Sequence, residues 1–586
     1  MERVQDLFER AEHWISHDPD AATRDELRAI VDRAKAGDAA AQKDLRDRFA
    51  GPLEFGTAGL RGVLGAGESY MNRAVVLRTS WGLAQYLLAE VPDVRVRGIV
   101  IGYDGRRLSR EFSEDAARVF AELGIVAHLS PLAIPTPLTA FAVTFLNAAA
   151  GVMVTASHNP PEYNGYKVYW GNGAQIIPPH DKGIAAAIDR CAPADEVKQM
   201  DLAEARKRGL VRDIGPLVEK IYLAEIRKLS VRSDGDRSLA IIYTPMHGVG
   251  DRLTRAALAE ARFSDVISVP EQARPDGAFP TVRFPNPEEK GALDLAIALA
   301  KAQKADLILA NDPDVDRLAV AVRSESGDYV QLSGNQVGTL LGHYLLTGGP
   351  PGDRIALASI VSSPQLGTIA RRLGARYEET LTGFKWIANR AMDLERETGA
   401  RFVFGYEEAL GYTVGPLVRD KDGIGAAVLF AELAAVRKAQ GKNVLEALDD
   451  ISREYGLFVS GQRSITMPGA DGVAKIKQLM VDLRKQTPTK IGDYEVESIS
   501  DILAGTRRDR EGNLGTVTLP PSDVLVYALQ GGSRIIARPS GTEPKIKFYF
   551  DVREEMQPHE APADAEKRAK QKMAALTEAF SKLAGV

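Results

Sequence analysis

Cysteine is nearly absent from this sequence, because Cys191 is the only one among 586 residues. One thiol forms neither an intramolecular disulfide nor a cluster of thiolate metal ligands, so we expect the chain to work in a reducing compartment. An excess of one charge is missing too, since 74 Lys and Arg residues oppose 79 Asp and Glu residues and leave a net charge of −5. This balance provides no general electrostatic attraction for nucleic acid or an anionic membrane.

A long hydrophobic run is also missing. The stretch that most resembles a membrane span, residues 123–161, is divided by prolines, an asparagine and a glycine into pieces shorter than the roughly 20 apolar residues that a spanning helix needs. We predict a buried helix near residues 137–147 and a buried strand near 151–155 instead. The N-terminal residues alternate charged and apolar side chains and lack the apolar core of a signal peptide. The prediction is a cytoplasmic protein without a membrane partner.

Short apolar runs that end in Gly, Asp, Ser or Pro alternate along the chain with amphipathic helical patterns. This alternation predicts α/β domains whose functional loops follow the carboxyl ends of strands. No short repeat of fixed period occurs, which disfavours solenoids and propellers. Near the C-terminus, three successive strand patterns and a closing amphipathic helix predict an α+β domain instead.

The length predicts about four domains of roughly 150 residues each. Charged helical or polar segments separate them. The predicted domains are residues 1–215, 216–330, 331–455 and 456–586. Each of these contains one loop whose residues are suited to chemistry.

The first loop is TASHNPPEYNGYK, residues 155–167. Ser157 is predicted at the end of a strand and two prolines follow it, so its hydroxyl is expected on a constrained loop. An isolated Ser-x-Asn pattern is more typical of a turn that bonds its own backbone. A serine hydrolase is a second interpretation, but no G-x-S-x-G elbow is present, and His158 is too close in the sequence to serve easily as the base for Ser157. Lys167 and the acidic loop described next favour a functional role.

The second loop, NDPDVDR, places Asp312, Asp314 and Asp316 two residues apart after an apolar run. Three carboxylates so close together repel one another unless a cation offsets their charge, and oxygen ligands select Mg²⁺ or Ca²⁺ over Zn²⁺. A calcium EF-hand is excluded, because its glycine and glutamate positions hold Arg317 and Arg323 here. We therefore predict a Mg²⁺ site rather than a solvated acidic turn.

The third loop is GYEEALGY, residues 405–412, in which Glu407 and Glu408 lie between aromatic residues. Carboxylates beside aromatic rings suit sugar hydroxyls, although a solvated turn explains the pattern about as well.

The fourth loop, RPSGTEPKIKFYF, brings Arg538, Ser540, Thr542 and Lys547 around Gly541. A guanidinium, two hydroxyls and an ammonium beside a glycine have the composition of a phosphate cradle. The same composition also occurs in ordinary turns.

Together the four loops resemble, in the same order, the active-site motifs of the α-D-phosphohexomutase superfamily, which includes phosphoglucomutases, phosphomannomutases and phosphopentomutases. The resemblance extends from GTAGLRG (56–62) to the fourth loop. TPMHGVG, LTGFKWI and RDKDGIGAA are most similar to the long phosphoglucomutase/phosphopentomutase-like branch. The resemblance implies three similar α/β domains with mixed sheets and a C-terminal α+β domain around a central cleft.

The resemblance also implies roles for individual residues. Ser157 carries a phosphoryl group and contributes an oxygen to a Mg²⁺ ion. The other implied Mg²⁺ ligands are Asp312, Asp314 and Asp316. The residues implied near the transferring phosphoryl group are Arg61, His158, Lys167 and Arg317. The residues implied to bind the sugar are Gly383, Lys385 and Glu407, and those implied to bind the distal phosphate are Arg538, Ser540, Gly541, Thr542 and Lys547.

The implied reaction interconverts glucose 1-phosphate and glucose 6-phosphate through a phosphoserine and a sugar bisphosphate, with sugar 1,6-bisphosphate as activator. Lys167 is predicted to move the proton of the attacking hydroxyl, with its pKa lowered by neighbouring positive charge such as Arg61. Many hexose-specific members have serine where this chain has Ala409, which leaves phosphopentomutase and phosphomannomutase as alternatives. A phosphatase and a catalytically silent phosphosugar sensor are alternatives of other classes. The expected assembly is a monomer or a homodimer.

Overall fold

The computed structural model describes residues 4–56, 59–349, 351–467, 470–540 and 545–586. The chain divides into two compact units. The first consists of Met1–Leu332 and Ala409–Val436, and the second of Ser333–Glu408 and Arg437–Val586.

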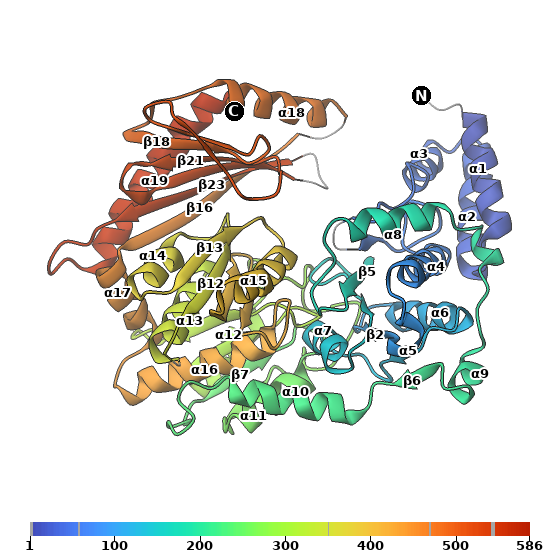
Figure 1. Cartoon of the computed structure of the whole chain (residues 1–586), viewed down its shortest axis with the longest axis horizontal. Helices are drawn as coiled ribbons and strands as arrows, with labels where there is room; N and C mark the ends of the chain where they lie inside the picture. The colour runs from blue at the N-terminus through green and yellow to red at the C-terminus, as the bar shows by residue number, and fades with distance from the viewer. Residues whose placement is uncertain (1–3, 57–58, 350, 468–469, 541–544) are drawn as a thin grey trace. The chain divides into compact units, whose positions relative to one another are not determined.

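Three helices lie at the N-terminus (Figure 1), and their buried apolar residues form one cluster that also includes Ala66. The three helices are α1 (Val4–His17), α2 (Ala21–Lys35) and α3 (Ala39–Arg48). Asp20 and Asp38 cap α2 and α3 by accepting hydrogen bonds from backbone N–H groups of the first turn, which satisfies donors that a helix leaves free at its start. Leu27 and Leu45 are fully buried between the helices.

The next part of the first unit is an α/β domain with a mixed sheet of order β1-β5-β4-β2-β3-β6. Its strands are β1 (Leu60–Val63), β2 (Ile99–Tyr103), β3 (Ala127–Leu129), β4 (Ala150–Val154), β5 (Tyr163–Trp170) and β6 (Val211–Asp213). Its helices are α4 (Arg73–Glu90), α5 (Val94–Arg97), α6 (Ser109–Glu122), α7 (Thr136–Phe145), α8 (His180–Asp189) and α9 (Leu202–Lys207), with a 3-10 turn at Ala194–Glu196.

The buried helix and strand predicted within residues 123–161 are confirmed as α7 and β4. All five residues of β4 are buried, because a central strand of such a sheet is covered on both faces. Proline at the first turn of α7 fits a helix start, where its missing N–H would have no partner.

A second α/β domain in the same unit has a five-stranded mixed sheet of order β11-β10-β9-β7-β8. Its strands are β7 (Ile241–Thr244), β8 (Val266–Ser268), β9 (Leu307–Ala310), β10 (Ala319–Arg323) and β11 (Tyr329–Gln331). Its helices are α10 (Pro216–Lys228), α11 (Asp251–Glu260) and α12 (Asp294–Gln303). The later elements β15 (Gly411–Val414) and α16 (Gly423–Ala439) return to this part of the chain, where Gly411 bridges to Arg317.

The second unit begins with a third α/β domain, in which β13 and β14 both pair in parallel with β12. Its strands are β12 (Arg354–Ser359), β13 (Arg376–Thr380) and β14 (Arg401–Glu407). Its helices are α13 (Gly334–Gly348), α14 (Gln365–Arg372), α15 (Phe384–Thr398) and α17 (Val444–Tyr455).

The C-terminal part of the second unit, in orange to red in Figure 1, contains an antiparallel sheet. Its strand order is β16-β23-β22-β21-β18-β19-β20, with β17 paired to β18. Its strands are β16 (Leu457–Thr466), β17 (Lys490–Ile491), β18 (Tyr494–Asp501), β19 (Thr506–Asp509), β20 (Leu514–Thr516), β21 (Leu525–Leu529), β22 (Arg534–Pro539) and β23 (Lys545–Glu554). Its helices are α18 (Ala470–Lys485) and α19 (Pro562–Ala584), which share one apolar cluster with the strands. The predicted α+β domain with a closing helix is confirmed.

The structure therefore has three α/β domains with sheets of their own and a C-terminal α+β domain, as the sequence predicted. Within the described part of the chain, no helix is both long enough and apolar enough to cross a membrane.

Candidate active site

Ser157 lies on the loop between β4 and β5, three residues after β4 ends at Val154. Its φ is +53°, a left-handed conformation that costs a non-glycine residue on the order of 1–3 kcal/mol and persists only where the surroundings impose it. Its backbone N–H donates to Thr155 Oγ1 at 2.9 Å, and its carbonyl oxygen accepts a hydrogen bond from Arg106 at 2.6 Å. The constrained serine loop predicted from the sequence is present, although the strand ends earlier than predicted.

The Ser157 hydroxyl points to the acidic loop of the second α/β domain. Its Oγ donates to Asp312 Oδ2 at 2.8 Å and lies 3.1 Å from His158 Nδ1. The two adjacent side chains therefore meet, and that His158 does not easily serve as the base for Ser157 stays a prediction. Burial and the positive charges of Arg317 and Arg61 lower the pKa of His158 well below its usual value, so the ring is neutral near pH 7.

The three aspartates of the acidic loop converge between β9 and β10. Asp312, Asp314 and Asp316 are at most 1% exposed, and each offers one carboxylate oxygen within 4.8 Å of the others. Asp314 Oδ1 and Asp316 Oδ1 are buried without a hydrogen-bond partner among the described residues. Buried carboxylate oxygens without partners are costly, and a divalent cation with a preference for oxygen ligands would satisfy them. The donor set therefore fits Mg²⁺.

Two lysines lie against these carboxylates. Lys167 Nζ donates to Asp314 Oδ2 at 2.7 Å and to Asp316 Oδ2 at 3.0 Å. Lys421 Nζ lies 3.2 Å from Asp316 Oδ2. The sequence reasoning missed Lys421 as a site residue, although it is part of the RDKDGIGAA segment that contributed to the family resemblance. The available sequence signal for Lys421 was its position between two aspartates. In the structure these aspartates accept hydrogen bonds from the Tyr169 and Tyr222 hydroxyls.

The predicted lowering of the Lys167 pKa is wrong for the arrangement described here. Burial does lower the pKa, but the negative charges of Asp314 and Asp316 outweigh burial and raise it. Arg61, expected to supply the opposing positive charge, is exposed and donates to Asn159 Oδ1 at 3.1 Å. Lys167 is therefore a charged partner of the carboxylates.

The acidic loop is held in place by close backbone approaches. Val315 has a φ of +66°, which is unusual for a β-branched residue. A Cβ on Gly248, in the TPMHGVG segment, would lie 2.3 Å from Pro313 Cα, and a Cβ on Gly423 would lie 2.6 Å from Val315 O. Only glycine fits at these two positions without displacing the loop. Arg317 completes this region, with its Nε 4.0 Å from Asp316 Oδ1.

The predicted sugar-binding residues lie in the second unit, at the ends of β13 and β14. Gly383, with a φ of +117°, donates its N–H to Glu407 Oε1 at 2.7 Å. Lys385 is 6% exposed, and its Nζ lies 5.5 Å from the Trp386 ring centroid. Glu408 accepts hydrogen bonds from the hydroxyls of Ser359, at the end of β12, and Ser362, on the loop that follows. The structure therefore brings the two predicted sugar loops together.

The aromatic residues on either side of Glu407 and Glu408 are part of the protein core. Tyr406 and Tyr412 are fully buried, so neither ring is available to a sugar. Tyr406 instead donates to Ser363 O at 3.2 Å. Alternation along β14 directs this side chain into the core while Glu407 points the other way. The sugar-binding prediction therefore rests on the carboxylates and not on these rings.

The predicted phosphate residues lie on β22, β23 and their connection. Arg538 and Lys547 are directly opposite each other on these antiparallel strands and half-buried, so their side chains emerge on one face of the sheet. Ser540 donates its N–H to Lys545 O at 2.7 Å. Gly541 and Thr542 lie outside the described residues. Burial and the charge of Glu408 raise the pKa of Tyr549 to about 12, while Arg538 opposes that rise.

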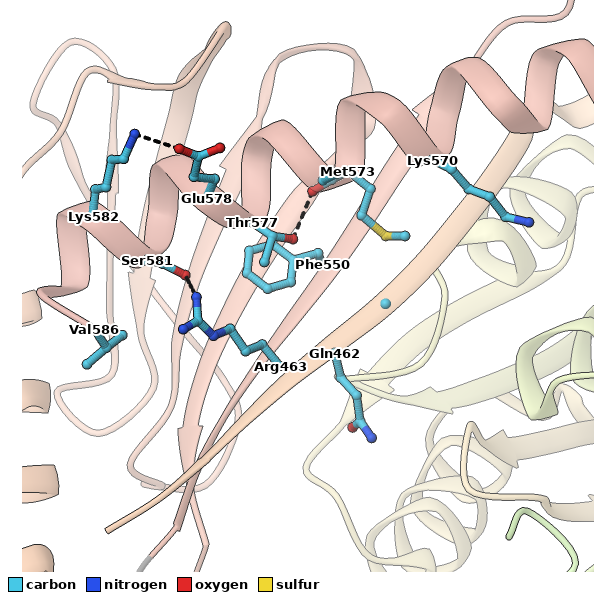
Figure 2. Close-up of a pocket in the computed structure, with 12 residues that line it drawn as sticks. Gln462, Arg463, Phe550, Lys570, Met573, Thr577, Glu578, Ser581, Lys582 and Val586 are labelled. Carbon is cyan, nitrogen blue, oxygen red and sulfur yellow. Dashed lines mark hydrogen bonds and ion pairs between the residues drawn. The ribbon is translucent and has the colours of Figure 1, made fainter. Parts of the chain in front are cut away.

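A hollow of about 590 Å³ lies elsewhere in the second unit, between β16 and α19. Figure 2 shows Arg463 from the strand reaching Ser581 on the helix, and Met573 and Phe550 lining the hollow. Its lining contains none of the residues predicted to act on a substrate. We therefore assign the candidate active site to the loops described above.

Comparison with known protein families identifies the chain. Models described as phosphoglucomutase/phosphomannomutase α/β/α domain I, domain II and domain III match residues 52–194, 220–327 and 333–455. The chain belongs to the phosphoglucomutase/phosphomannomutase family. The resemblance to the α-D-phosphohexomutase superfamily inferred from four loops is thereby confirmed.

Relatives within this family carry several substrate names. A protein named probable phosphomannomutase in Haemophilus influenzae is 44% identical over 82% of this chain and 93% of the relative. The phosphoribomutase of Saccharomyces cerevisiae is 37% identical over 93% of each chain, and the phosphoglucomutase of Staphylococcus epidermidis is 37% identical over 85% of this chain and 90% of the relative. The chain is accordingly a phosphomutase, an isomerase of phosphosugars, and the names do not agree on its sugar.

Solved structures in this family have the same fold. The phosphoglucomutase pp63/parafusin from Paramecium, in an open form, aligns with a TM-score of 0.68 at 18% identity over 92% of this chain and 97% of its own. A phosphoglucomutase/phosphomannomutase family protein from Burkholderia thailandensis aligns with a TM-score of 0.62 at 20% identity over 90% and 97% of the two chains.

Proposed function

We propose that this phosphomutase interconverts glucose 1-phosphate and glucose 6-phosphate, with Ser157 as the phosphoryl carrier. The observation that carries this proposal is the contact between the Ser157 hydroxyl and Asp312. A nucleophile that touches a buried cluster of three carboxylates is suited to hold a phosphoryl group beside a divalent cation. Neither a structural turn nor a solvated acidic loop requires that contact.

The residues of the first unit would act on the transferring phosphoryl group. Asp312, Asp314 and Asp316 would hold Mg²⁺, which offsets negative charge on phosphoryl oxygens when bound. Lys167 and Lys421 add positive charge at the same place. In the forward step the bond from phosphorus to Ser157 Oγ breaks and a bond to the sugar hydroxyl oxygen forms. The proton that the sugar hydroxyl loses is balanced by the proton that Ser157 Oγ gains, so the serine hydroxyl is restored. The bisphosphate then returns its other phosphate to Ser157.

The residues of the second unit would bind the rest of the substrate. Glu407 offers a carboxylate to sugar hydroxyls, beside the loop of Gly383 and Lys385. Arg538 and Lys547 would hold the phosphate that does not react, together with the loop of residues 540–542. Sugar 1,6-bisphosphate would act as the activator, since it supplies the phosphoryl group that Ser157 needs before the first turnover.

Ribose phosphate is the second candidate substrate, because Ala409 removes one hydroxyl that could contact the sugar. We predict a dominant activity with glucose 1-phosphate and a measurable one with ribose 1-phosphate. One neutral hydrogen bond contributes about 0.5–1.5 kcal/mol, which corresponds to at most roughly tenfold in kcat/KM. Ala409→Ser is therefore expected to shift the ratio of the two kcat/KM values towards glucose by up to about tenfold.

The measurement is a coupled assay on glucose, mannose and ribose 1-phosphates, with release of inorganic phosphate recorded in parallel. A kcat/KM for ribose 1-phosphate well above that for glucose 1-phosphate would make this chain a phosphopentomutase. Phosphate release in place of isomer formation would support a phosphatase, and no turnover of any sugar would support a silent sensor.

A separate prediction concerns Arg538. Arg538→Ala is expected to raise KM for the sugar monophosphate at least about tenfold, because a hydrogen bond to a charged group contributes roughly 1.5–3 kcal/mol. kcat should change less, since a remote phosphate is held equally in the ground state and the transition state. The control is Arg508→Ala, on exposed β19 of the same sheet. Unchanged KM and kcat in Arg538→Ala would show that Arg538 does not bind the phosphate of the substrate.

A further inference from the structure

Arg106, which none of the four loops contains, makes an unusual set of hydrogen bonds to the serine loop. Its guanidinium donates to four backbone carbonyls of that loop: Ser157 at 2.6 Å, Asn159, Pro160 at 2.9 Å and Tyr163 at 3.2 Å. The side chain is completely buried. A planar group with a fixed fork of donors can satisfy several carbonyls at once, which an ammonium cannot do.

Asp104, the ion-pair partner of Arg106, is linked through Thr155 to the backbone N–H of the same serine. Asp104 lies 3.4 Å from Arg106 Nε and accepts the Thr155 hydroxyl at 2.7 Å. Thr155 Oγ1 in turn accepts the N–H of Ser157. Both polar backbone groups of Ser157 are thus tied to one buried ion pair, the N–H through Thr155 and the carbonyl directly. These ties account for the left-handed φ of Ser157, which a free loop would not retain.

Arg106 also contacts the domain that carries the acidic loop. Its guanidinium carbon lies 5.0 Å from the Phe279 ring centroid, within the range of a cation–π interaction. A Cβ on Gly277 would lie 2.9 Å from Arg107 N and 3.0 Å from Gly105 O. The backbone of the second α/β domain therefore packs directly against residues 105–107, and both contacts lie within the first unit.

We propose that Arg106 is a positioning residue that sets the placement of Ser157 Oγ against Asp312. It acts through the loop backbone and does not touch the substrate. This inference rests on the proposed function, in which Ser157 carries the phosphoryl group. Because a misplacement of about 1 Å at a reacting atom costs about 10²-fold in rate, loosening the loop should reduce turnover strongly while substrate binding by the second unit stays intact.

The test is Arg106→Lys, which keeps the charge and loses the planar fork. We expect kcat to fall about 100-fold and KM for the sugar monophosphate to change less than threefold. The rate at which Ser157 is phosphorylated by glucose 1,6-bisphosphate, followed by intact mass, should fall by the same factor as kcat. The control is Arg110→Lys, at an exposed position four residues further on in α6 that pairs with Glu114, and it should leave all three quantities unchanged.

The Tm of each variant, measured by thermal unfolding, shows whether a lower kcat results from a misplaced Ser157 or from a smaller folded fraction. Rates are measured well below the Tm of each variant. Thr155→Val is the second variant. It keeps every charged side chain but removes the hydroxyl that accepts the Ser157 N–H and donates to Asp104, and it should also lower kcat with KM unchanged. The inference is overturned if both variants keep kcat within threefold of wild type, or if the loss follows only the folded fraction. Ser157→Ala tests the carrier role separately, so active Arg106→Lys beside inactive Ser157→Ala would refute this inference alone.

Discussion

Ser157→Ala is expected to reduce mutase turnover by at least about 10⁴-fold. A covalent carrier provides the path of lower barrier, so its removal costs several kcal/mol of transition-state stabilisation. The Ser157 hydroxyl also donates to Asp312, but the other aspartates keep their contacts with Lys167, so the fold should persist. A coupled isomerase assay measures turnover, and circular dichroism measures the Tm.

Ser157→Gly is a second variant, chosen because glycine suits the backbone conformation of Ser157. Because Ser157 has a φ of +53°, glycine accepts this conformation more readily than alanine does. Both variants should be equally inactive, which would show that the hydroxyl and not the backbone is needed. Ser113→Ala is the control, because this buried hydroxyl bonds only its own helix in the contacts described, through Arg110 O at 2.7 Å.

Intact-mass measurement adds a direct readout of the carrier. Wild-type protein incubated with glucose 1,6-bisphosphate should gain the mass of one phosphoryl group, and neither Ser157 variant should gain it. Turnover near wild type in the alanine variant would end the carrier hypothesis. A phosphoryl adduct that persists in that variant would move the carrier to another residue.

Asp314→Asn is expected to lower turnover by about 10²–10³-fold and to weaken Mg²⁺ binding in parallel. The change keeps the shape of the side chain but removes one negative charge from a donor set in which two buried oxygens, Asp314 Oδ1 and Asp316 Oδ1, lack hydrogen-bond partners among the described residues. Loss of one electrostatic contact to a transition state typically has an effect of this size. Calorimetric titration with Mg²⁺ and the coupled assay over a range of Mg²⁺ concentrations are the measurements.

Asp328→Asn is the matched control, because this exposed carboxylate in the same domain pairs with Lys301 at 2.8 Å. It should leave Mg²⁺ affinity and turnover unchanged. Removal of divalent metal by a chelator should abolish wild-type activity, and added Mg²⁺ should restore it. Full activity in excess chelator would refute the metal assignment, and unchanged Mg²⁺ affinity in Asp314→Asn would remove that residue from the ligand set.

The sequence could predict those features that depend on neighbouring residues. The apolar runs before Ser157 and Asp312 predict buried strands, and both strands are present as β4 and β9. The prolines and polar residues that follow predict loops, and both side chains lie on loops. Periodicity and turn chemistry are local properties, so the α/β order, the C-terminal α+β domain and the four loops followed from the residues themselves.

Other features depend on residues far apart in the chain. Tyr406 is buried although it lies beside Glu407, because the interior faces that side of β14. The pKa of Lys167 is raised and not lowered, because the fold places it on Asp314, 147 residues away. Lys421 and Arg106 belong to the site region for the same reason.

The sequence by itself determined which loops are candidates for chemistry and to which family the chain is similar, because residue type, order and local pattern suffice for that. Only the tertiary structure decided the partners of the charged groups and the conformation of Ser157. A buried charge takes its pKa and its orientation from whichever groups the packing brings within a few ångströms, and a left-handed serine is stable only where contacts from other segments impose it.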